Sequence, residues 1–206
     1  MLNTCVKCKK YSVKKQISSD GRSMTCPFCG HSQEIKQMPL FIITGASGVG
    51  KTTISAQLFQ KEKDYIVMDG DILWNDSFNV PEDNYRKFRE LWLRMCKNIS
   101  QIGKPVVLCG CAVPEQYEDC LERRYFSELH YITIVCDEDI LYKRLTEDLR
   151  YEEDHPYVKV SMDFNIWLKE NADKTQPSMQ LLDNSHLTVD EAAKIVEHWI
   201  YKYINK

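Results

Sequence analysis

The sequence lacks any long hydrophobic run. None of its apolar stretches approaches the roughly 20 residues that a helix needs to span a bilayer. The amino-terminal stretch MLNTCVKCKKYSVKK also lacks the continuous hydrophobic segment of a secretory signal. We therefore expect a cytoplasmic protein that has no membrane partner. A chain of 206 residues is long enough for one main domain and a small additional module.

The sequence also lacks a strong excess of charge, since its formal net charge is −3. The charge is uneven, because residues 1–37 carry seven basic and two acidic side chains and the remainder is acidic. The weak positive charge of residues 1–37 does not by itself predict a surface that binds nucleic acid. Contact with nucleic acid stays open for this segment, and its candidate residues are Lys7, Lys9, Lys10, Lys14 and Lys15.

The nine cysteines are an odd number, and without an export signal they do not indicate disulfide bonds. Four of them form two Cys-x-x-Cys pairs, Cys5 with Cys8 and Cys26 with Cys29, separated by 17 residues. Two residues between cysteines let both sulfur atoms reach one ion, and a short hairpin can bring the pairs together. We therefore predict a structural Zn²⁺ site, which replaces the core that so short a segment cannot form. A redox pair is the alternative.

Residues 1–37 resemble a zinc ribbon. The stretch YSVKKQISSDGRSMTC between the cysteine pairs predicts two short strands around a turn at residues 19–21. Residues 33–39 read as a linker to the rest of the chain. The resemblance implies a small module that is either structural or a docking surface.

A glycine-rich stretch follows this linker. Residues 45–52, GASGVGKT, match G-x-x-x-x-G-K-[ST] in full, after a short apolar run and before helical spacing. Glycines let backbone N–H groups turn toward a phosphate, and the start of a helix adds unpaired donors. Lys51 can then reach the β- and γ-phosphates, and the Thr52 hydroxyl can bind Mg²⁺. We predict a nucleoside triphosphate site, rather than a simple turn, formed by Gly45, Ala46, Ser47, Gly48, Val49, Gly50, Lys51, Thr52 and Thr53.

Short apolar runs alternate with helical segments through the rest of the chain. This alternation implies right-handed crossovers and a parallel sheet that is covered by helices on both faces. We therefore predict an α/β fold with a five-stranded parallel sheet and a ligand site at the carboxyl ends of its strands. The predicted strands are Leu40–Thr44, Tyr65–Met68, Val106–Cys109, Tyr131–Val135 and Met179–Leu182.

Two carboxylates follow the second run, in the sequence Asp69-Gly70-Asp71. One carboxylate can orient Mg²⁺ while the other accepts a hydrogen bond or proton from an acceptor hydroxyl, and either assignment stays open. The alternative is a turn in which Asp69 caps the next helix. The third run ends in Cys109, where a Walker B strand would end in aspartate, and this strengthens the case that Asp69 or Asp71 binds magnesium. Gly110 comes next and can let the backbone approach the acceptor closely.

Four arginines are candidates for binding charged groups. Residues 83–102 predict a long amphipathic helix, and Arg86 and Arg89 lie near the border of its apolar face. They either bind an anionic or polar acceptor or remain surface residues. Arg144 and Arg150 follow the fourth run and can close over the nucleotide, unless Arg144 pairs with Asp148 within one helix.

Residues 38–204 resemble the P-loop kinases of the nucleoside or nucleotide, shikimate and gluconate type. The resemblance rests on the phosphate loop, the Asp-Gly-Asp sequence, the arginine-bearing segment and the terminal LDNSHLTVDEAAKIVEHWI. It implies a P-loop kinase domain over residues 38–206 with a lid near 137–172, which uses ATP and Mg²⁺. It also implies that Arg144 and Arg150 stack on the nucleotide or belong to the lid, and that Asn184 lies near the adenine.

The chain departs from these kinases in two respects. The ribbon is not part of the usual small kinase, and the lid lacks the arginine-rich pattern of adenylate kinases, so the acceptor stays open. The first hypothesis is transfer of a phosphoryl group to a nucleoside or nucleotide, with a sugar-like or antibiotic hydroxyl as the next candidate acceptor. The second is an NTPase, or a polynucleotide kinase, that docks nucleic acid or protein through the ribbon. The predicted acceptor residues are Asp71, Arg86, Arg89 and Gly110.

Overall fold

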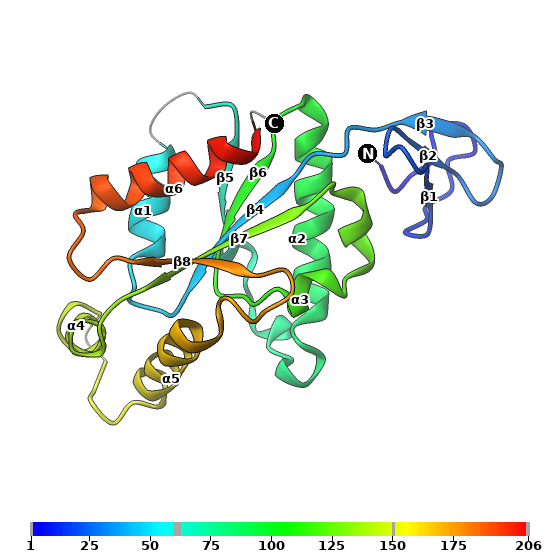
Figure 1. Cartoon of the computed structure of the whole chain (residues 1–206). Coiled ribbons are helices and arrows are strands. Elements are labelled where there is room, and N and C mark those ends of the chain that lie inside the picture. Colours follow the sequence, from blue (N-terminus) through cyan, green and yellow to red (C-terminus); the bar gives the residue numbers. More distant parts are fainter. Residues whose placement is uncertain (1, 60–62, 150, 205–206) are drawn as a thin grey trace.

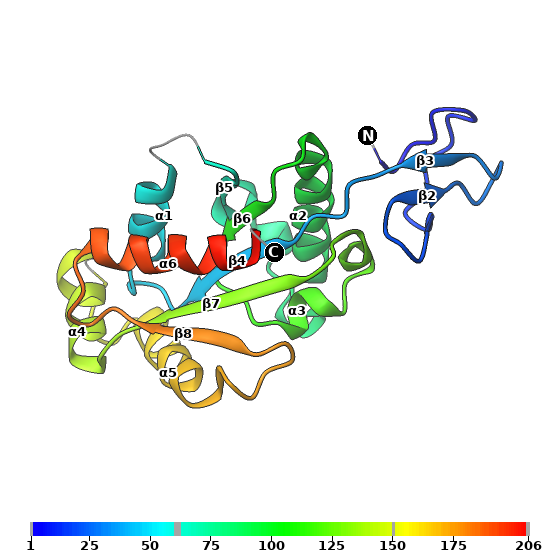
Figure 2. The same ribbon diagram turned by 45° about the horizontal axis from the view of Figure 1, so that its top comes forward.

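The computed structural model describes residues 2–59, 63–149 and 151–204, and two β-sheets occur within these ranges (Figure 1). A small antiparallel sheet is formed by the amino-terminal residues, and a larger parallel sheet by the rest. Figure 2 shows that the small sheet lies to one side of the large one in a second view as well. No helix in the described ranges has both the length and the hydrophobicity needed to cross a bilayer.

The large sheet contains five parallel strands, as predicted, and their order is β5-β6-β4-β7-β8. All residues of the central strand β4 are buried, and its side chains alternate between two core clusters, one on each face. Burial of both faces explains why the strands read as continuous apolar runs. The strands are β4 (Leu40–Gly45), β5 (Ile66–Asp69), β6 (Val106–Cys109), β7 (Leu129–Val135) and β8 (Met179–Asp183).

Helices cover both faces of this sheet, which confirms the predicted fold class (Figures 1 and 2). Helices α1 (Lys51–Phe59) and α6 (Val189–Ile204) pack together on one face. Helix α2 (Arg86–Ile99) and the second half of α5 (Pro156–Asn171) contribute to the core on the other face. Two short helices, α3 (Glu115–Glu118) and α4 (Glu138–Lys143), follow β6 and β7.

Helix α2 is shorter than the predicted helix over residues 83–102. Short 3₁₀ turns flank it at Pro81–Asp83 and Ser100–Ile102. Between the first turn and α2, Asn84 and Tyr85 have left-handed backbones with φ of 50° and 55°, which interrupts the helix. The apolar spacing continues through this interruption, so the sequence pattern did not reveal it.

The small sheet contains strands β1 (Gln16–Ile17), β2 (Ser23–Thr25) and β3 (Ser32–Glu34), all antiparallel. The first two are the strands expected around the turn at residues 19–21. The third shortens the linker predicted over residues 33–39, because Ser23 pairs with Glu34 and Met24 with Gln33. We call residues 2–37 the ribbon from here on.

The ribbon packs against α2 near the amino ends of the parallel strands. Leu2, Met24 and Ile35 of the ribbon belong to the same buried cluster as Trp92 of α2. Lys36 and Gln101 exchange two hydrogen bonds of 2.9 Å at the edge of this contact. The ribbon therefore shares a core with the main domain instead of being joined to it by a linker alone.

A buried ionic network reinforces this contact. Glu122 is 1% exposed and accepts hydrogen bonds from Asn3 Nδ2 (3.2 Å) and Arg94 Nε (3.1 Å). It also forms an ion pair with Lys97 of α2, whose side chain is fully buried. The network joins the ribbon to the carboxyl-terminal half of α2.

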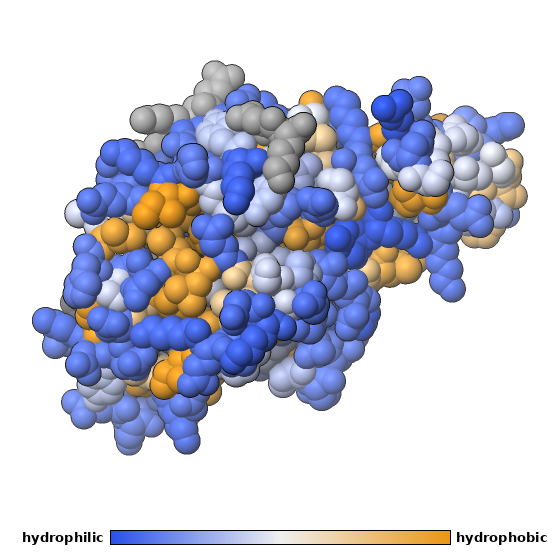
Figure 3. All heavy atoms as spheres, in the orientation of Figure 1, coloured by the Kyte–Doolittle hydropathy of each residue, from blue (hydrophilic) through white to orange (hydrophobic). Residues whose placement is uncertain are grey.

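The face seen in Figure 3 is mostly polar, with hydrophobic side chains gathered over β8 and α6. Leu181 of the edge strand β8 and Val189 and Ile195 of α6 are 39–42% exposed. The edge strand is therefore covered only in part on this side.

Candidate active site

The phosphate loop connects β4 to α1. Gly45 has a φ of 149°, and a Cβ atom there would collide with the carbonyl oxygen of Ile134. Gly48 has a φ of 80°, and a Cβ atom there would lie 3.0 Å from Leu141 Cδ1. Only glycine fits these two positions without strain. Helix α1 begins at Lys51, so its unpaired N–H groups face the loop, an arrangement suited to an anion.

Lys51 folds back onto this loop. The residue is 9% exposed, and its Nζ donates a hydrogen bond of 2.7 Å to the carbonyl oxygen of Ala46. This partner is uncharged, so the ammonium group keeps its capacity to pair with an anion. Thr52 and Thr53 are exposed in the first turn of α1.

A cavity of about 460 Å³ opens over the phosphate loop, and we call it the nucleotide cavity. The loop contributes Ser47, Gly48 and Gly50 to its lining, together with Lys51 to Thr53. Ala46 and Val49 are buried beneath it and contribute backbone groups. Residues from five later segments complete the lining, among them Asp69, Asp71, Arg144 and Asn184.

Asn184 ties the segment after β8 to the phosphate loop. Its side-chain Nδ2 donates a hydrogen bond of 2.7 Å to the carbonyl oxygen of Val49. The residue is 6% exposed, and its Oδ1 is buried without a hydrogen-bond partner among the described residues. Asn184 thus lies beside the phosphate loop, and residues 187–189 line the cavity farther along the chain.

Arg144 lies at the start of a π-helical turn, Arg144–Asp148, directly after α4. It lines the nucleotide cavity, and its Nη1 is buried without a hydrogen-bond partner among the described residues. Arg144 and Asp148 are both described residues and both line the cavity, but they form no ion pair with each other, so the alternative considered for Arg144 is not realised. Arg150, the second predicted arginine, lies outside the described residues.

The Asp-Gly-Asp sequence forms a fixed turn at the carboxyl end of β5. Asp69 caps a 3₁₀ turn and accepts a hydrogen bond of 2.9 Å from the N–H group of Asp71, so the capping alternative is realised. The buried Trp92 donates its indole N–H to the Gly70 carbonyl oxygen at 3.0 Å. A Cβ atom at Gly70 would lie 2.8 Å from the carbonyl oxygen of Cys109. These contacts hold both carboxylates beside the phosphate loop.

The two carboxylates differ in their surroundings. Burial raises the pKa of Asp71, and the neighbouring charge of Asp69 raises it further, while Lys51 and Arg89 oppose the rise. Cys109 occupies the end of β6, and burial raises the pKa of its thiol to about 11, so it stays neutral near pH 7. The end of β6 therefore offers no anionic ligand, and β5 supplies the carboxylates of the site.

A second cavity of about 870 Å³ adjoins the first, and we call it the acceptor cavity. The two share six lining residues, among them Ser47 of the phosphate loop, Asp71 and Cys111. The acceptor cavity lies between the segment after β5, α2, the segment after β6 and the first half of α5. Its aromatic lining consists of Trp74, Tyr85, Phe88, Tyr117, Tyr157 and Phe164.

The structure brings two of the predicted acceptor residues to this cavity besides Asp71. Gly110 lines both cavities, and a Cβ atom there would meet nothing closer than 3.8 Å, so its lack of a side chain keeps the passage open. Arg89 lines the acceptor cavity. Arg86 lies outside both linings, and its Nη1 donates a hydrogen bond to the Asp119 carbonyl oxygen at 2.8 Å.

Sequence reasoning missed several residues of the acceptor cavity. Gln116 was not among the predicted site residues, yet its Oε1 accepts hydrogen bonds from Arg89 (3.0 Å) and from the Val113 N–H group (3.3 Å). The position of Gln116 just after β6 could have predicted this role, because segments that follow parallel strands line ligand sites. Trp74 and Phe164 gave no comparable signal, since isolated aromatics are more often core residues.

Comparisons with known proteins agree with this geometry. A protein-family model described as an AAA domain matches residues 42–162, which is more than half of the chain. The chain belongs to this family. The match begins within β4 and ends within α5, so this AAA domain includes the phosphate loop and most of both cavities. A search of curated proteins finds no match.

Two solved structures share the fold of this AAA domain. One is the tunicamycin resistance protein of Deinococcus radiodurans, with 16% identity and a TM-score of 0.59, covering 80% of this chain and 96% of that one. The other is a sugar kinase from Janibacter sp. HTCC2649, with 14% identity and a TM-score of 0.55, covering 80% and 95%. These two structures thus confirm the predicted fold.

The AAA domain is preceded by a cluster of four thiols in the ribbon. The sulfur atoms of Cys5, Cys8, Cys26 and Cys29 all lie within 4.8 Å of one another. Two of the separations are 3.8 Å and 3.7 Å, close to the roughly 3.8 Å expected when four sulfur atoms surround Zn²⁺ tetrahedrally at about 2.3 Å. A hydrogen bond from the Cys8 N–H group contributes most to lowering the pKa of Cys5 to about 6. This donor set fits one zinc ion.

Proposed function

We propose that the protein is an ATP- and Mg²⁺-dependent phosphotransferase that acts on a hydroxyl group of a small molecule. The observation that carries this proposal is the junction of the two cavities. The phosphate loop lines one, an aromatic-rich cavity of about 870 Å³ adjoins it, and Asp71 belongs to both. An NTPase that only hydrolyses ATP would have no use for a second cavity of this size beside its phosphates.

The proposed transfer assigns a role to each group at the junction. The acceptor hydroxyl hydrogen-bonds to Asp71, and its oxygen forms a bond to the γ-phosphorus while the bond to the β–γ bridging oxygen breaks. ADP leaves with the electrons of that bond, and the hydroxyl proton passes to Asp71. The raised pKa of Asp71 suits it to this proton, since a carboxylate with a higher pKa is a stronger base.

The remaining groups bind and orient the nucleotide. Lys51 leaves the Ala46 carbonyl and pairs with the β- and γ-phosphates, and the buried Nη1 of Arg144 supplies a further donor. Thr52 and Asp69 would hold Mg²⁺, which neutralises phosphate charge when bound. Residues 137–172 act as a lid, an idea supported by Tyr157, which lines both cavities.

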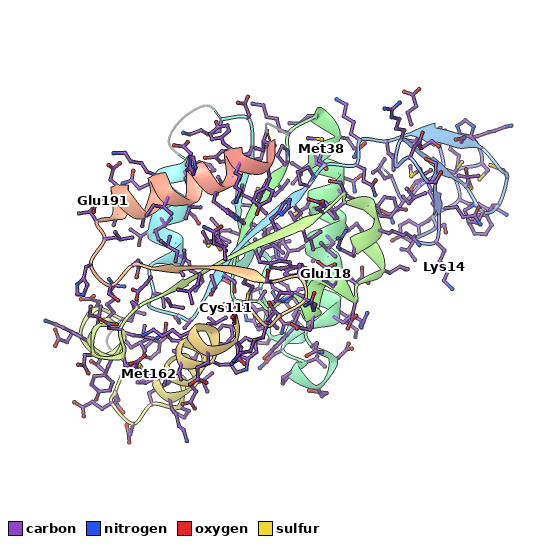
Figure 4. All side chains as sticks on the ribbon, viewed as in Figure 1. Lys14, Met38, Cys111, Glu118, Met162 and Glu191 are labelled. Carbon is purple, nitrogen blue, oxygen red and sulfur yellow. The ribbon has the colours of Figure 1, made fainter. Side chains whose placement is uncertain are left out.

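The acceptor we propose first is a nucleoside or nucleotide. Flat aromatic side chains line the cavity, and such side chains stack on planar rings. A sugar-like hydroxyl compound is the next candidate, in line with the sugar kinase that shares the fold. The ribbon packs at the opposite end of the sheet from the cavities, as the positions of Lys14 and Cys111 in Figure 4 show, and this favours a small acceptor over one delivered by the ribbon.

A coupled assay of ADP release over nucleosides, nucleotides, sugars, aminoglycosides and a 5′-hydroxyl oligonucleotide tests the proposal. We expect turnover with at least one small acceptor, and Lys51→Ala should abolish it while leaving the unfolding temperature unchanged. Lys87→Ala, on the exposed side of α2, serves as the control for loss of a lysine. Normal turnover by Lys51→Ala would refute the assignment, and turnover with the oligonucleotide alone would favour a polynucleotide kinase.

A further inference from the structure

Trp92 joins the middle of α2 to the turn that carries the two carboxylates. Its side chain is fully buried, and its indole N–H group donates a hydrogen bond of 3.0 Å to the Gly70 carbonyl oxygen. Gly70 separates Asp69 from Asp71 and is itself buried beside the carbonyl oxygen of Cys109. The indole therefore bonds to the backbone one residue away from the proposed base.

Gly70 is the last buried residue before α2. Residues 71–87 are all described by the structure, and every one of them is at least partly exposed, with Ile72 63% exposed. The segment that begins with Asp71 therefore contains no fully buried side chain before Phe88. The place of Asp71 relative to the phosphate loop thus depends on how the chain is held at Gly70, where the Trp92 indole bonds.

The ribbon holds the other half of α2. The Leu2 N–H group donates a hydrogen bond of 3.0 Å to Asn98 Oδ1, which lies six residues after Trp92, or about 9 Å along an α-helix. Met24 of the ribbon is 1% exposed and belongs to the same buried cluster as Trp92. A close-packed core transmits displacements, because it has few voids that could absorb them. Buried contacts therefore continue from the ribbon through α2 to the carboxylates.

We propose that the ribbon contributes to phosphoryl transfer without touching a substrate: it holds α2 in place, and Trp92 of this helix positions the Asp-Gly-Asp turn. This inference rests on the proposed phosphotransferase and adds a positioning residue to it. Trp92 lines neither cavity, so it acts through the Gly70 carbonyl group and Asp71. A displacement of about 1 Å in a reacting group can lower a rate about 100-fold.

Removal of the indole N–H group tests the Trp92 contact. Trp92→Phe should lower kcat by about 10- to 100-fold, while calorimetry should show a change of less than about 3-fold in the affinity for Mg-ADP. Benzothienylalanine at position 92 has sulfur in place of the N–H group and nearly the same shape. It should give the same result, which covers the case in which the phenylalanine variant folds poorly.

A second buried tryptophan provides the matched control. Trp199 of α6 is 3% exposed and belongs to the core cluster on the other face of the sheet. It lines neither cavity. Trp199→Phe removes the same atoms from a core and should therefore leave kcat unchanged.

A ribbon variant tests the contact between the ribbon and α2. Met24→Ala leaves a cavity in the cluster that contains Trp92, and should lower kcat by about 3- to 10-fold with the affinity for Mg-ADP retained. In the Trp92→Phe background the same change should add little, because the hydrogen bond through which it acts is already absent. Val6→Ala, at a ribbon position that is 53% exposed, should leave kcat unchanged.

Hydrogen exchange gives a second measurement that needs no acceptor. The Asp71 N–H group bonds to Asp69 Oδ1 in the turn. It should exchange faster in Trp92→Phe and in Met24→Ala than in the native protein, and at the native rate in Trp199→Phe.

Four results would overturn the proposal and leave the phosphotransferase standing. They are an unchanged kcat in both variants of position 92, an unchanged kcat in Met24→Ala, additive losses in the double variant, and a loss of Mg-ADP affinity in Trp92→Phe as large as the loss of kcat. The last result would indicate general destabilisation. Native protein that fails to bind Mg-ATP refutes the phosphotransferase and this inference together.

Discussion

Replacing Glu122 with glutamine would remove one negative charge from the contact between the ribbon and α2. The side chain keeps nearly the same shape, so the change is electrostatic. Glu122 accepts hydrogen bonds from Asn3 and Arg94 and pairs with Lys97. Burial lowers the pKa of Lys97 to about 8, and Glu122 opposes this fall. Without Glu122, burial lowers the pKa of Lys97 further, which favours the neutral amine.

The size of the effect follows from these contacts. At pH 7, removing a proton from a group with a pKa of about 8 costs about 1 kcal/mol. The hydrogen bonds from Asn3 and Arg94 each lose a charged acceptor, which costs about 1 kcal/mol apiece. The sum of about 3 kcal/mol agrees with measured losses on breaking buried pairs. It is a large part of a typical free energy of unfolding of about 5–15 kcal/mol and lowers Tm by about 6–12 °C.

Urea and thermal unfolding at pH 7 and pH 9, followed by tryptophan fluorescence, measure this effect. In the native protein, Lys97 gives up its own proton as the pH rises through about 8, whereas the unfolded lysine keeps its proton to about pH 10.4. The difference between native and variant should therefore shrink by about 1 kcal/mol at pH 9.

An exposed ion pair provides the control for this experiment. Asp190→Asn removes the exposed partner of Lys194 and should leave the free energy of unfolding unchanged within error. A loss below about 1 kcal/mol in Glu122→Gln at pH 7, or a difference that grows with pH, would refute the reasoning.

Two further predictions concern the active site and the ribbon. Asp71→Asn should lower kcat by about 10²- to 10⁴-fold, with a smaller change in Mg-ATP affinity measured by calorimetry. A loss of Mg-ATP affinity as large as the loss of kcat would contradict the role of Asp71 as the base. Because the pKa of Asp71 is raised, native activity should fall with decreasing pH at a higher pH than for an ordinary carboxyl group, and the kcat–pH profile of native protein checks this. Native protein should contain one zinc ion per chain, whereas Cys26→Ser should lose it and unfold at lower temperature; a metal-free ribbon with unchanged Tm would exclude the zinc site.

The features that the sequence revealed are those that depend on local pattern. The phosphate loop needs glycines at fixed offsets, and the two motif glycines, Gly45 and Gly50, do have positive φ values of 149° and 96°. The parallel strands read as apolar runs because both of their faces are buried. The cysteine spacing likewise predicted four sulfur atoms close enough to share one ion.

The features that the sequence concealed depend on contacts between distant segments. Arg86 and Arg89 looked equivalent at the border of one helix, yet Arg89 turns toward Cys111 and Gln116 while Arg86 bonds to the Asp119 carbonyl group. Lys15 was a candidate residue for contact with nucleic acid, but it is 2% exposed. No local sequence pattern predicts the burial or the hydrogen-bond partners of these side chains, because the residues that contact them lie far away in the sequence.

The ribbon and the mouths of the two cavities lie at opposite ends of the parallel sheet. A tether fixed to an exposed position on the ribbon, such as Phe28, would therefore leave both entrances open. Single molecules could be immobilised this way and observed through repeated rounds of catalysis.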